Sequence, residues 1–312
     1  MIVRGRPHGA QLLYIIRGSV LPHIAWELAV VTGVALLVTL THGFIYQWKI
    51  TLTTVPFTLI GLALAIFLGF RNNAAYDRYW EGRKLWADLV YRSRSFAREV
   101  QTLLHYDAPA RLQDLDDPRR LLILRAIAFA STLRHQLRGT DAAPDVQRLL
   151  GVEEARAFGA MRCGTEYLLR EMGATLGSEL RARRLDAPVA ADIDQSLTAM
   201  AAVAASCERI KNTPIPFPYT LLLHRTAWLY CFLLPFGLVD MVGFMTPFVV
   251  AIVAYTFFGL DALGDEIEEP FGLADNHLPL DALCRDIEIS LLEALGEREL
   301  PAPLVPVNLR LT

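Results

Sequence analysis

The sequence predicts an all-α membrane protein with four transmembrane helices and a large cytoplasmic helical domain, in which the second transmembrane helix continues into the cytosol. Its composition is one reason, because 53% of the 312 residues are hydrophobic and 20% are charged. This mixture is too apolar for an ordinary soluble protein and too charged for a chain that lies wholly in lipid. The apolar residues gather in four long runs on either side of a charged middle segment. The second run passes into this segment without a proline.

The four apolar runs cover residues 24–44, 55–70, 217–239 and 241–260. A helix needs about 20 apolar residues to cross a bilayer, with roughly 17 as the short limit, so the second run is marginal and the others are adequate. The sequence lacks the alternating segments of about ten residues that are typical of an outer-membrane barrel. We therefore expect each run to cross the membrane as a helix.

The distribution of basic residues predicts the orientation in the membrane. Arg4, Arg6 and Arg17 precede the first run, and several arginines and one lysine follow the second run between residues 71 and 98. Lys49 is the only basic residue in the connections at 45–54 and around residue 240. The positive-inside rule then places both termini and the middle segment in the cytoplasm, as in a multi-pass protein of the inner (plasma) membrane. No signal peptide is expected, because the first run starts too late and is too long.

Residues 71–213 carry apolar residues at helical spacing, with charged residues on the other faces. Turn-forming residues predict breaks at 108–109, 116–118, 139–144 and 186–188. We expect four segments: an N-terminal segment with the first two transmembrane helices (1–70), the cytoplasmic helical domain (71–213), the third and fourth transmembrane helices (214–262), and a cytoplasmic acidic turn, C-terminal helix and tail (263–312). Prolines in residues 298–312 favour an extended tail.

One stripe of apolar residues runs along the second predicted helix. Leu62, Ile66 and Phe70 recur at i, i+4 and i+8, and the polar Asn73 and Asp77 continue the stripe. Several such helices around an axis would form a pore whose narrowest part consists of apolar rings, and such rings can gate by dewetting. The same stripe could instead pack in a membrane core. Spacing alone favours the second interpretation.

Acidic residues directly follow the fourth run, at Asp261, Asp265, Glu266, Glu268 and Glu269. A cluster of this kind is more often a solvated segment at the exit from the membrane than a metal site. Facing carboxylates around an oligomer axis would instead concentrate cations.

His224 and Arg225 lie inside the third apolar run. Ionisable groups in a membrane span usually face protein or water. These two lie near the beginning of the run, which favours the interpretation that they snorkel to the interface.

The sequence contains no catalytic constellation. It has no glycine-rich phosphate loop, no nucleophile elbow and no paired histidine motif. The four cysteines lack metal-ligand spacing and are expected to be buried structural thiols. The net charge of −3 argues against nucleic acid as a partner. We therefore expect no enzyme, no cofactor and no metal site.

Three separated segments resemble the hallmark motifs of prokaryotic bestrophins. They are FLGFRNNAAYDRYWEGRKLW at 67–86, PIPFPYTLLLHR at 214–225 and DEIEEPFGLADNHLPLDALCRDIE at 265–288, and RGSVLP at 17–22 resembles a fourth. The resemblance extends from the N-terminus to about residue 297. It implies a homopentamer in the lipid bilayer with four transmembrane helices per subunit, a large cytoplasmic helical domain and one ion pathway along the five-fold axis.

The resemblance also implies two constrictions. In this family the second transmembrane helix lines a neck of three apolar rings, which fall here on Leu62, Ile66 and Phe70. The first is leucine where isoleucine is usual, a volume-conserving change. One apolar residue before the third span forms a cytoplasmic aperture, and Leu180 is the candidate. Eukaryotic members have an acidic calcium clasp after the PFG motif, but residues 273–277 offer too few oxygen ligands, so no calcium gate is expected.

The resemblance implies a channel for small monovalent ions, with chloride or other anions preferred because the family is named for anion conduction. A sodium or potassium channel of the same architecture is the alternative, since apolar rings carry no fixed charge. The aromatic edge of Phe70 would favour anions, whereas Glu179 or the acidic cluster would favour cations. A non-conducting membrane sensor would share the same composition. A transporter would show repeated halves, and the two halves of this chain are not alike.

Overall fold

The computed structural model describes residues 1–5, 9, 14–16, 18–45, 48–49 and 52–312. Arg6 and Arg17 of the predicted orientation signal, and with Arg17 the start of the motif at 17–22, lie outside the described residues. The described chain is mainly helical, as predicted. Its two short strands, β1 (Phe44–Ile45) and β2 (Trp48–Lys49), pair antiparallel with Phe44 opposite Lys49.

The chain folds into two compact units. The apolar unit comprises residues 4–79 and 214–270, and the polar unit comprises residues 1–3, 80–213 and 271–312. Helix α2 (Thr54–Leu103) contributes its first half to the apolar unit and its second half to the polar unit. The four-segment division expected from the sequence, with boundaries at 70, 213 and 262, stays a prediction.

Helix α2 is a single helix of 50 residues. Pro56 lies in its first turn, where a missing N–H costs no hydrogen bond. The prediction that the helix continues unbroken from the apolar run to Gly82 or beyond is confirmed. One continuous helix therefore contains both the apolar half and the charged half of this segment.

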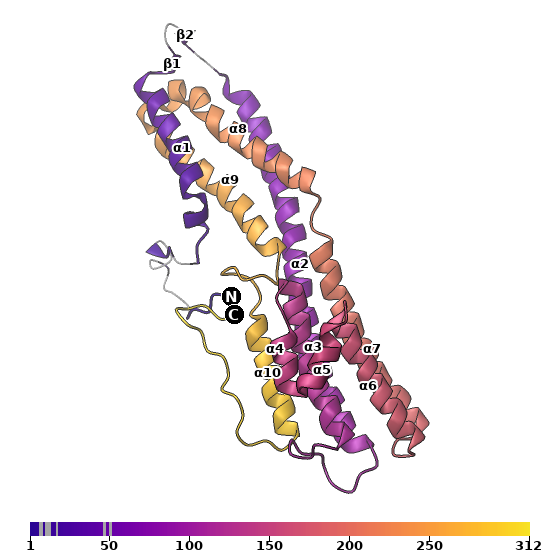
Figure 1. Ribbon diagram of the computed structural model, residues 1–312. Coiled ribbons are helices and arrows are strands. Elements are labelled where there is room, and N and C mark those ends of the chain that lie inside the picture. The colour runs from indigo at the N-terminus through magenta and orange to yellow at the C-terminus, as the bar shows by residue number, and fades with distance from the viewer. Residues whose placement is uncertain (6–8, 10–13, 17, 46–47, 50–51) are drawn as a thin grey trace. The chain divides into compact units, whose positions relative to one another are not determined.

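The apolar unit consists of the first half of α2 together with α1 (Leu21–Leu40), α8 (Phe217–Val242), the 3₁₀ turn η2 (Gly243–Met245) and α9 (Thr246–Glu268). Helices α1, α8 and α9 pack side by side (Figure 1). Three helical stretches among the described residues are long and apolar enough to cross a membrane: Leu21–Leu40, Thr54–Leu103 and Phe217–Glu268. The third stretch includes α8, η2 and α9.

The turn between α8 and α9 lies slightly later than the sequence predicts. We expected it around Asp240, but α8 continues to Val242 and the chain turns at Gly243, whose φ is 56°. Only glycine adopts this conformation without strain, so the turn falls there. Helix α9 then extends beyond the apolar run to Glu268, so Asp265, Glu266 and Glu268 lie in its last turns, and Glu269 follows the helix.

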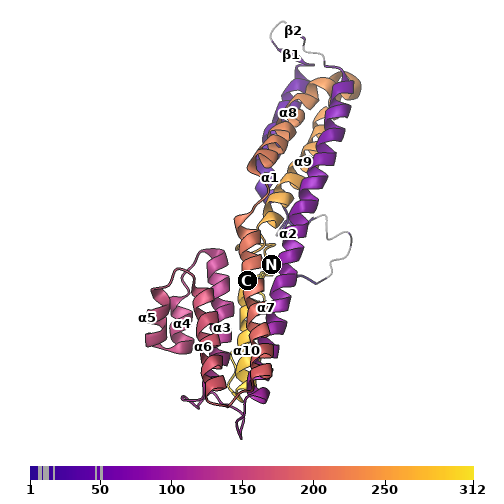
Figure 2. The ribbon, with the colours of Figure 1, turned by 90° about the vertical axis from the view of Figure 1, so that its right-hand side faces the viewer.

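The polar unit is a bundle around one buried helix. It consists of the second half of α2 with α3 (Pro118–Arg138), α4 (Ala143–Leu150), α5 (Val152–Gly159), α6 (Gly164–Arg181), α7 (Ala187–Asn212) and α10 (Leu280–Ala294). Helix α3 contacts α4, α6, α7 and α10 (Figure 2), and every residue from Leu122 to Leu133 is buried.

The helix boundaries in the polar unit follow the predicted breaks. Asp117 caps α3 by accepting a hydrogen bond from the Arg119 N–H at 2.8 Å, and Gly139 ends the helix in the left-handed conformation. The breaks predicted at 108–109 and 116–118 form one non-helical stretch, 104–117, and those predicted at 139–144 and 186–188 contain the starts of α4 and α7. Two further breaks were not predicted: one at Gly151, whose φ is 90°, and one at residues 160–163.

Three of the four cysteines match the prediction of buried thiols. Cys207, Cys231 and Cys284 are buried, whereas Cys163 is exposed and so corrects the prediction. Cys163 immediately precedes the first residue of α6, where a loop brings it to the surface.

The C-terminal tail is extended, as predicted, and it pairs with the N-terminus. The Val3 N–H donates to the Leu309 carbonyl at 2.8 Å, and the Leu311 N–H donates to the Met1 carbonyl at 2.9 Å. The two ends of the chain therefore lie side by side in the polar unit (Figure 1).

Candidate functional site

The first half of α2 has a buried face. Phe57, Leu64, Leu68 and Ala75 are exposed by 9% or less. They recur at spacings of seven and four residues, which brings them to one side of a helix. On this side the ring of Phe57 meets that of Tyr230 in α8 edge-on, with the centroids 5.9 Å apart. This face therefore holds α2 against the rest of the apolar unit.

The opposite face carries the three predicted neck residues. Leu62, Ile66 and Phe70 are exposed by 59%, 48% and 60%. Asn73 and Asp77, which continue the stripe, are also exposed. At about 100° per residue, the exposed stripe points roughly 180° away from the buried one. The subunit itself leaves this line of large apolar side chains uncovered, which indicates a surface that another molecule or lipid covers.

The predicted aperture residue, Leu180, lies in the last turn of α6 and is 38% exposed. Its neighbour Glu179 is only 2% exposed. The Glu179 carboxylate accepts hydrogen bonds from Arg184 Nε at 2.7 Å, from Arg184 Nη2 at 2.8 Å and from the Tyr106 hydroxyl at 2.8 Å. These three bonds anchor the end of α6 through Glu179 while Leu180 remains at the surface.

The charge of Glu179 is matched by that of Arg184. Hydrogen bonds from Arg184 hold the pKa of Glu179 below its ordinary value, and the Tyr106 hydroxyl adds to this effect, while burial opposes it. Burial and then the hydrogen bond to Glu179 raise the pKa of Tyr106 to about 12. The carboxylate is therefore ionised and the phenol neutral near pH 7. A carboxylate paired in this way attracts a passing cation less than the free carboxylate considered from the sequence.

The acidic cluster predicted at the membrane exit lies at the end of α9. Asp265 contacts the guanidinium group of Arg71 in α2, and the Glu268 carboxylate lies 3.9 Å from it. Glu266 is half-buried and Glu269 is exposed. Asp265 and Glu268 are thus directed at an arginine of the same chain.

Arg71 also forms a buried pair with Asp261 that the sequence analysis did not predict. The side chains of Arg71 and Asp261 are exposed by 0% and 6%, and Arg71 Nη1 lies 2.6 Å from Asp261 Oδ1. The other oxygen, Asp261 Oδ2, lies 2.7 Å from His224 Nδ1 in α8, and the His224 side chain as a whole is 48% exposed. A signal was available: Arg71 immediately follows one apolar run and Asp261 immediately follows another.

Within the described part of the chain, no group of three or more His, Cys, Asp or Glu side chains is placed to hold a metal ion. In the segment after the PFG motif, His277 Nδ1 accepts a hydrogen bond from the Ala274 N–H at 3.2 Å. Asp275 Oδ1 lies 3.7 Å from Arg310 Nε. The expectation that this chain has no calcium gate stays a prediction.

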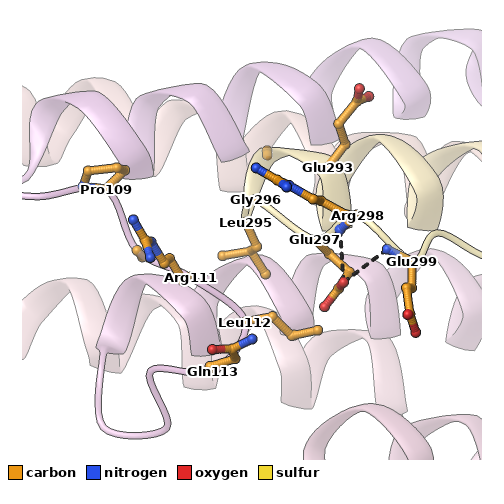
Figure 3. Close-up of a pocket in the computed structure, with 12 residues that line it drawn as sticks. Pro109, Arg111, Leu112, Gln113, Glu293, Leu295, Gly296, Glu297, Arg298 and Glu299 are labelled. Carbon is orange, nitrogen blue, oxygen red and sulfur yellow. Dashed lines mark hydrogen bonds between the residues drawn. The ribbon is translucent and has the colours of Figure 1, made fainter.

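A cavity of about 810 Å³ lies in the polar unit between the loop at 109–113 and residues 293–299 at the end of α10 (Figure 3). The Glu297 carboxylate accepts hydrogen bonds from the backbone N–H groups of Arg298 and Glu299, at 2.8 Å and 3.0 Å. None of the predicted neck, aperture or acidic residues lines this cavity. The predicted ion pathway and the cavity are thus built from different residues.

Together, the apolar helices and the helical polar unit define a membrane protein of the all-α class. The profile of the family described as "Bacterial/Fungal Bestrophin protein" matches residues 1–293. The chain therefore belongs to the bacterial and fungal bestrophin family.

Relatives match over nearly the whole chain. The voltage-dependent anion channel-forming protein mll4386 of Mesorhizobium japonicum is 43% identical, with 99% of this chain and 96% of the relative covered. The voltage-dependent anion channel-forming protein YneE of Escherichia coli K12 is 41% identical, with 98% of both covered. The crystal structure of a bacterial bestrophin homolog from Klebsiella pneumoniae is similar with a TM-score of 0.82 and 38% identity, covering 88% of this chain and 99% of that one.

The pairing of Glu179 generates a prediction about acid stability. Because the pKa of Glu179 is lowered in the folded protein, its contribution is present above the ordinary glutamate pKa of about 4.3 and is lost as the pH falls through the lowered value. We expect Glu179→Gln to lower the melting temperature at pH 7 by a few degrees. We also expect the melting temperature of this variant to fall less than that of the parent when the pH is lowered from 7 to 3. Thermal unfolding between pH 7 and pH 3 measures both effects.

The matched control is Glu166→Gln, which changes an exposed glutamate of the same helix. It should leave the curve of melting temperature against pH unchanged. If Glu179→Gln gives the same curve as this control, the pairing with Arg184 and Tyr106 does not stabilise the end of α6.

Proposed function

We propose that the chain forms a homopentameric channel of the inner membrane that conducts small monovalent ions, with anions preferred. In this proposal α1, α2, α8 and α9 cross the bilayer, and both termini and the polar unit lie in the cytoplasm. The basic residues that follow the second apolar run support this orientation. Five copies of α2 surround the ion pathway.

The observation that carries the proposal is the exposed apolar stripe on α2. Leu62, Ile66 and Phe70 point away from the face that packs within the subunit. In a symmetric ring, each would contribute one of five identical side chains to a ring around the axis. Three such rings, one helical turn apart, would form a narrow neck from which water withdraws readily.

The proposed second constriction lies at Leu180. Its side chain is exposed in the subunit while Glu179, beside it, fixes the end of α6. A single ring of leucines in a wider vestibule would restrict ions mainly by size, because it presents no charge and little length. The two constrictions would therefore have different tasks.

Anion preference is proposed because several relatives are named voltage-dependent anion channel-forming proteins. The positive edges of the Phe70 rings would contribute weak attraction for anions. The pairing of Glu179 with Arg184 removes one free negative charge from the neighbourhood of Leu180. The proposal makes no use of catalysis, a metal or a cofactor.

The reversal potential of the purified protein in a planar bilayer under a KCl gradient tests the proposed function. A reversal near the chloride equilibrium potential is expected. A reversal near the potassium potential would make the protein a cation channel of the same architecture. A purified pentamer that carries no current under any applied voltage would favour a non-conducting membrane sensor, and a monomer or dimer by native mass spectrometry would contradict the proposed ring.

A further prediction concerns the neck. Replacing Phe70 or Ile66 by alanine widens an apolar ring and relaxes dewetting, so the single-channel conductance should rise by roughly two-fold or more. The control is Leu229→Ala, which removes a leucine of α8 whose exposed fraction, 60%, equals that of Phe70. Unchanged single-channel currents in both neck variants would remove the neck from this account.

Replacing Leu180 tests whether the proposed aperture selects ions by size or controls the opening of the channel. Leu180→Ala enlarges the opening without adding charge, so permeability ratios between small and large ions of one sign should shift toward the large ions. Open probability should change less than these ratios. Reversal potentials under bi-ionic conditions measure them, and Met161→Ala is the control because Met161 has a similar exposed fraction, 42%. Equal ratios in the variant and the parent would contradict the assignment of Leu180.

A further inference from the structure

Arg71 is buried in the apolar unit although it directly follows Phe70. Its side chain is 0% exposed, and its guanidinium group is the donor in hydrogen bonds to Asp261 and Asp265 of α9. Glu268 lies 3.9 Å away in the same helix. Burial of an arginine is unfavourable unless carboxylates compensate its charge, and here α9 supplies three. The guanidinium group is therefore held by one helix and at one place.

The position of Arg71 on α2 relates it to the neck. It continues the buried stripe of Leu64 and Leu68 and lies roughly 140° around the helix from the average direction of the neck stripe. The apolar members of the buried stripe make contacts that depend little on angle. A forked guanidinium group bonded to two carboxylates has a preferred direction. Arg71 is thus the member of this stripe best able to fix the rotation of α2 about its own axis.

A second contact at the same level supports this constraint. The Asn72 side-chain amide donates to the Leu260 carbonyl of α9 at 3.0 Å. A side chain at Gly264 would bring its Cβ within 2.4 Å of Asn72 Oδ1 and 3.4 Å of Arg71 Nη1. Glycine at 264 therefore lets α2 and α9 approach closely where the ion pairs form.

The same carboxylate also reaches a third helix. Asp261 accepts from Arg71 with Oδ1, and its Oδ2 lies 2.7 Å from His224 Nδ1 in α8. Asp261 thus joins α2 and α8 to α9 at a single residue. The contact joins the buried face of α2 to α8 and α9 and does not involve the exposed stripe of α2.

We propose that Arg71 is a positioning residue for the neck: its ion pairs with α9 set the rotation of α2 and so the direction in which Phe70 points. This inference rests on the proposed function, because it takes Phe70 to line the ion pathway. The neck width then depends on a contact behind the helix as well as on the side chains of the rings. Arg71 itself does not touch the ion.

The experiment is a double-mutant cycle on single-channel conductance with the full-length protein in planar bilayers. It uses the parent, Arg71→Lys, Phe70→Ala and the double variant. Lysine keeps the charge but cannot reach two carboxylates with a planar fork, so α2 should be held less firmly. We expect Phe70→Ala to raise the conductance less in the lysine background than the roughly two-fold or more expected in the parent, because the two residues are coupled.

A second cycle pairs Arg71→Lys with Leu180→Ala. These changes affect different constrictions, so their effects should multiply, whereas a general loss of structure would alter both cycles. Arg83→Lys is the matched control because Arg83 is an exposed arginine of the same helix. It should leave both the conductance and the effect of Phe70→Ala unchanged.

The outcomes separate the inference from the proposed function. If Phe70→Ala has no effect in the parent, the neck itself fails and the role of Arg71 fails with it. If Phe70→Ala changes the conductance of the parent by the same factor as it changes that of Arg71→Lys, the neck is supported and the inference about Arg71 is overturned. If Arg71→Lys does not assemble, Asp265→Asn replaces it, because the Asp265 side chain is 58% exposed and tolerates neutralisation better. Simple multiplication of Asp265→Asn with Phe70→Ala would likewise overturn the inference.

Discussion

The burial of Arg71 is the constraint on which the arrangement of the apolar unit depends. A charge removed from water must be compensated within a few ångströms, and the compensating carboxylates belong to α9. Once Arg71 and Asp261 are paired, the face of α2 that packs within the subunit is fixed, and so is the face that remains exposed. The exposed face contains Leu62, Ile66 and Phe70. A polar contact at the end of the apolar run therefore orients an apolar surface that extends two turns above it.

Much of this arrangement could be predicted from the sequence, because it depends on local chemistry. The continuity of α2 follows from the lack of a proline after its first turn, and the ends of α3 follow from Asp117 and Gly139. The pairing of the acidic cluster with Arg71 was not predicted. That pairing joins residues about 190 positions apart, and no helical periodicity carries such information. The break at Gly151 was missed for a different reason, since a single glycine predicts a turn only weakly.

The two proposed constrictions are supported in different ways. Around α2, the carboxylates outnumber the arginine that they contact, so a buried network holds the helix from behind. At the end of α6, Glu179 is matched by Arg184, five residues further along the chain, and by the hydroxyl of Tyr106, which follows α2. In both places a charged or polar anchor lies next in sequence to an apolar residue of the proposed pathway. Adjacent residues of a helix point in directions about 100° apart, so an anchor can be held by a neighbouring element while the next residue points in a different direction.

The most direct test of this account is an experimental structure of the purified protein in a lipid environment, determined by electron cryomicroscopy. We expect a ring of five subunits in which Leu62, Ile66 and Phe70 face the symmetry axis and Arg71 points away from it, toward Asp261 of the same subunit. A structure in which these three side chains face lipid, or pack against a helix away from any axis, would rule out the proposed neck.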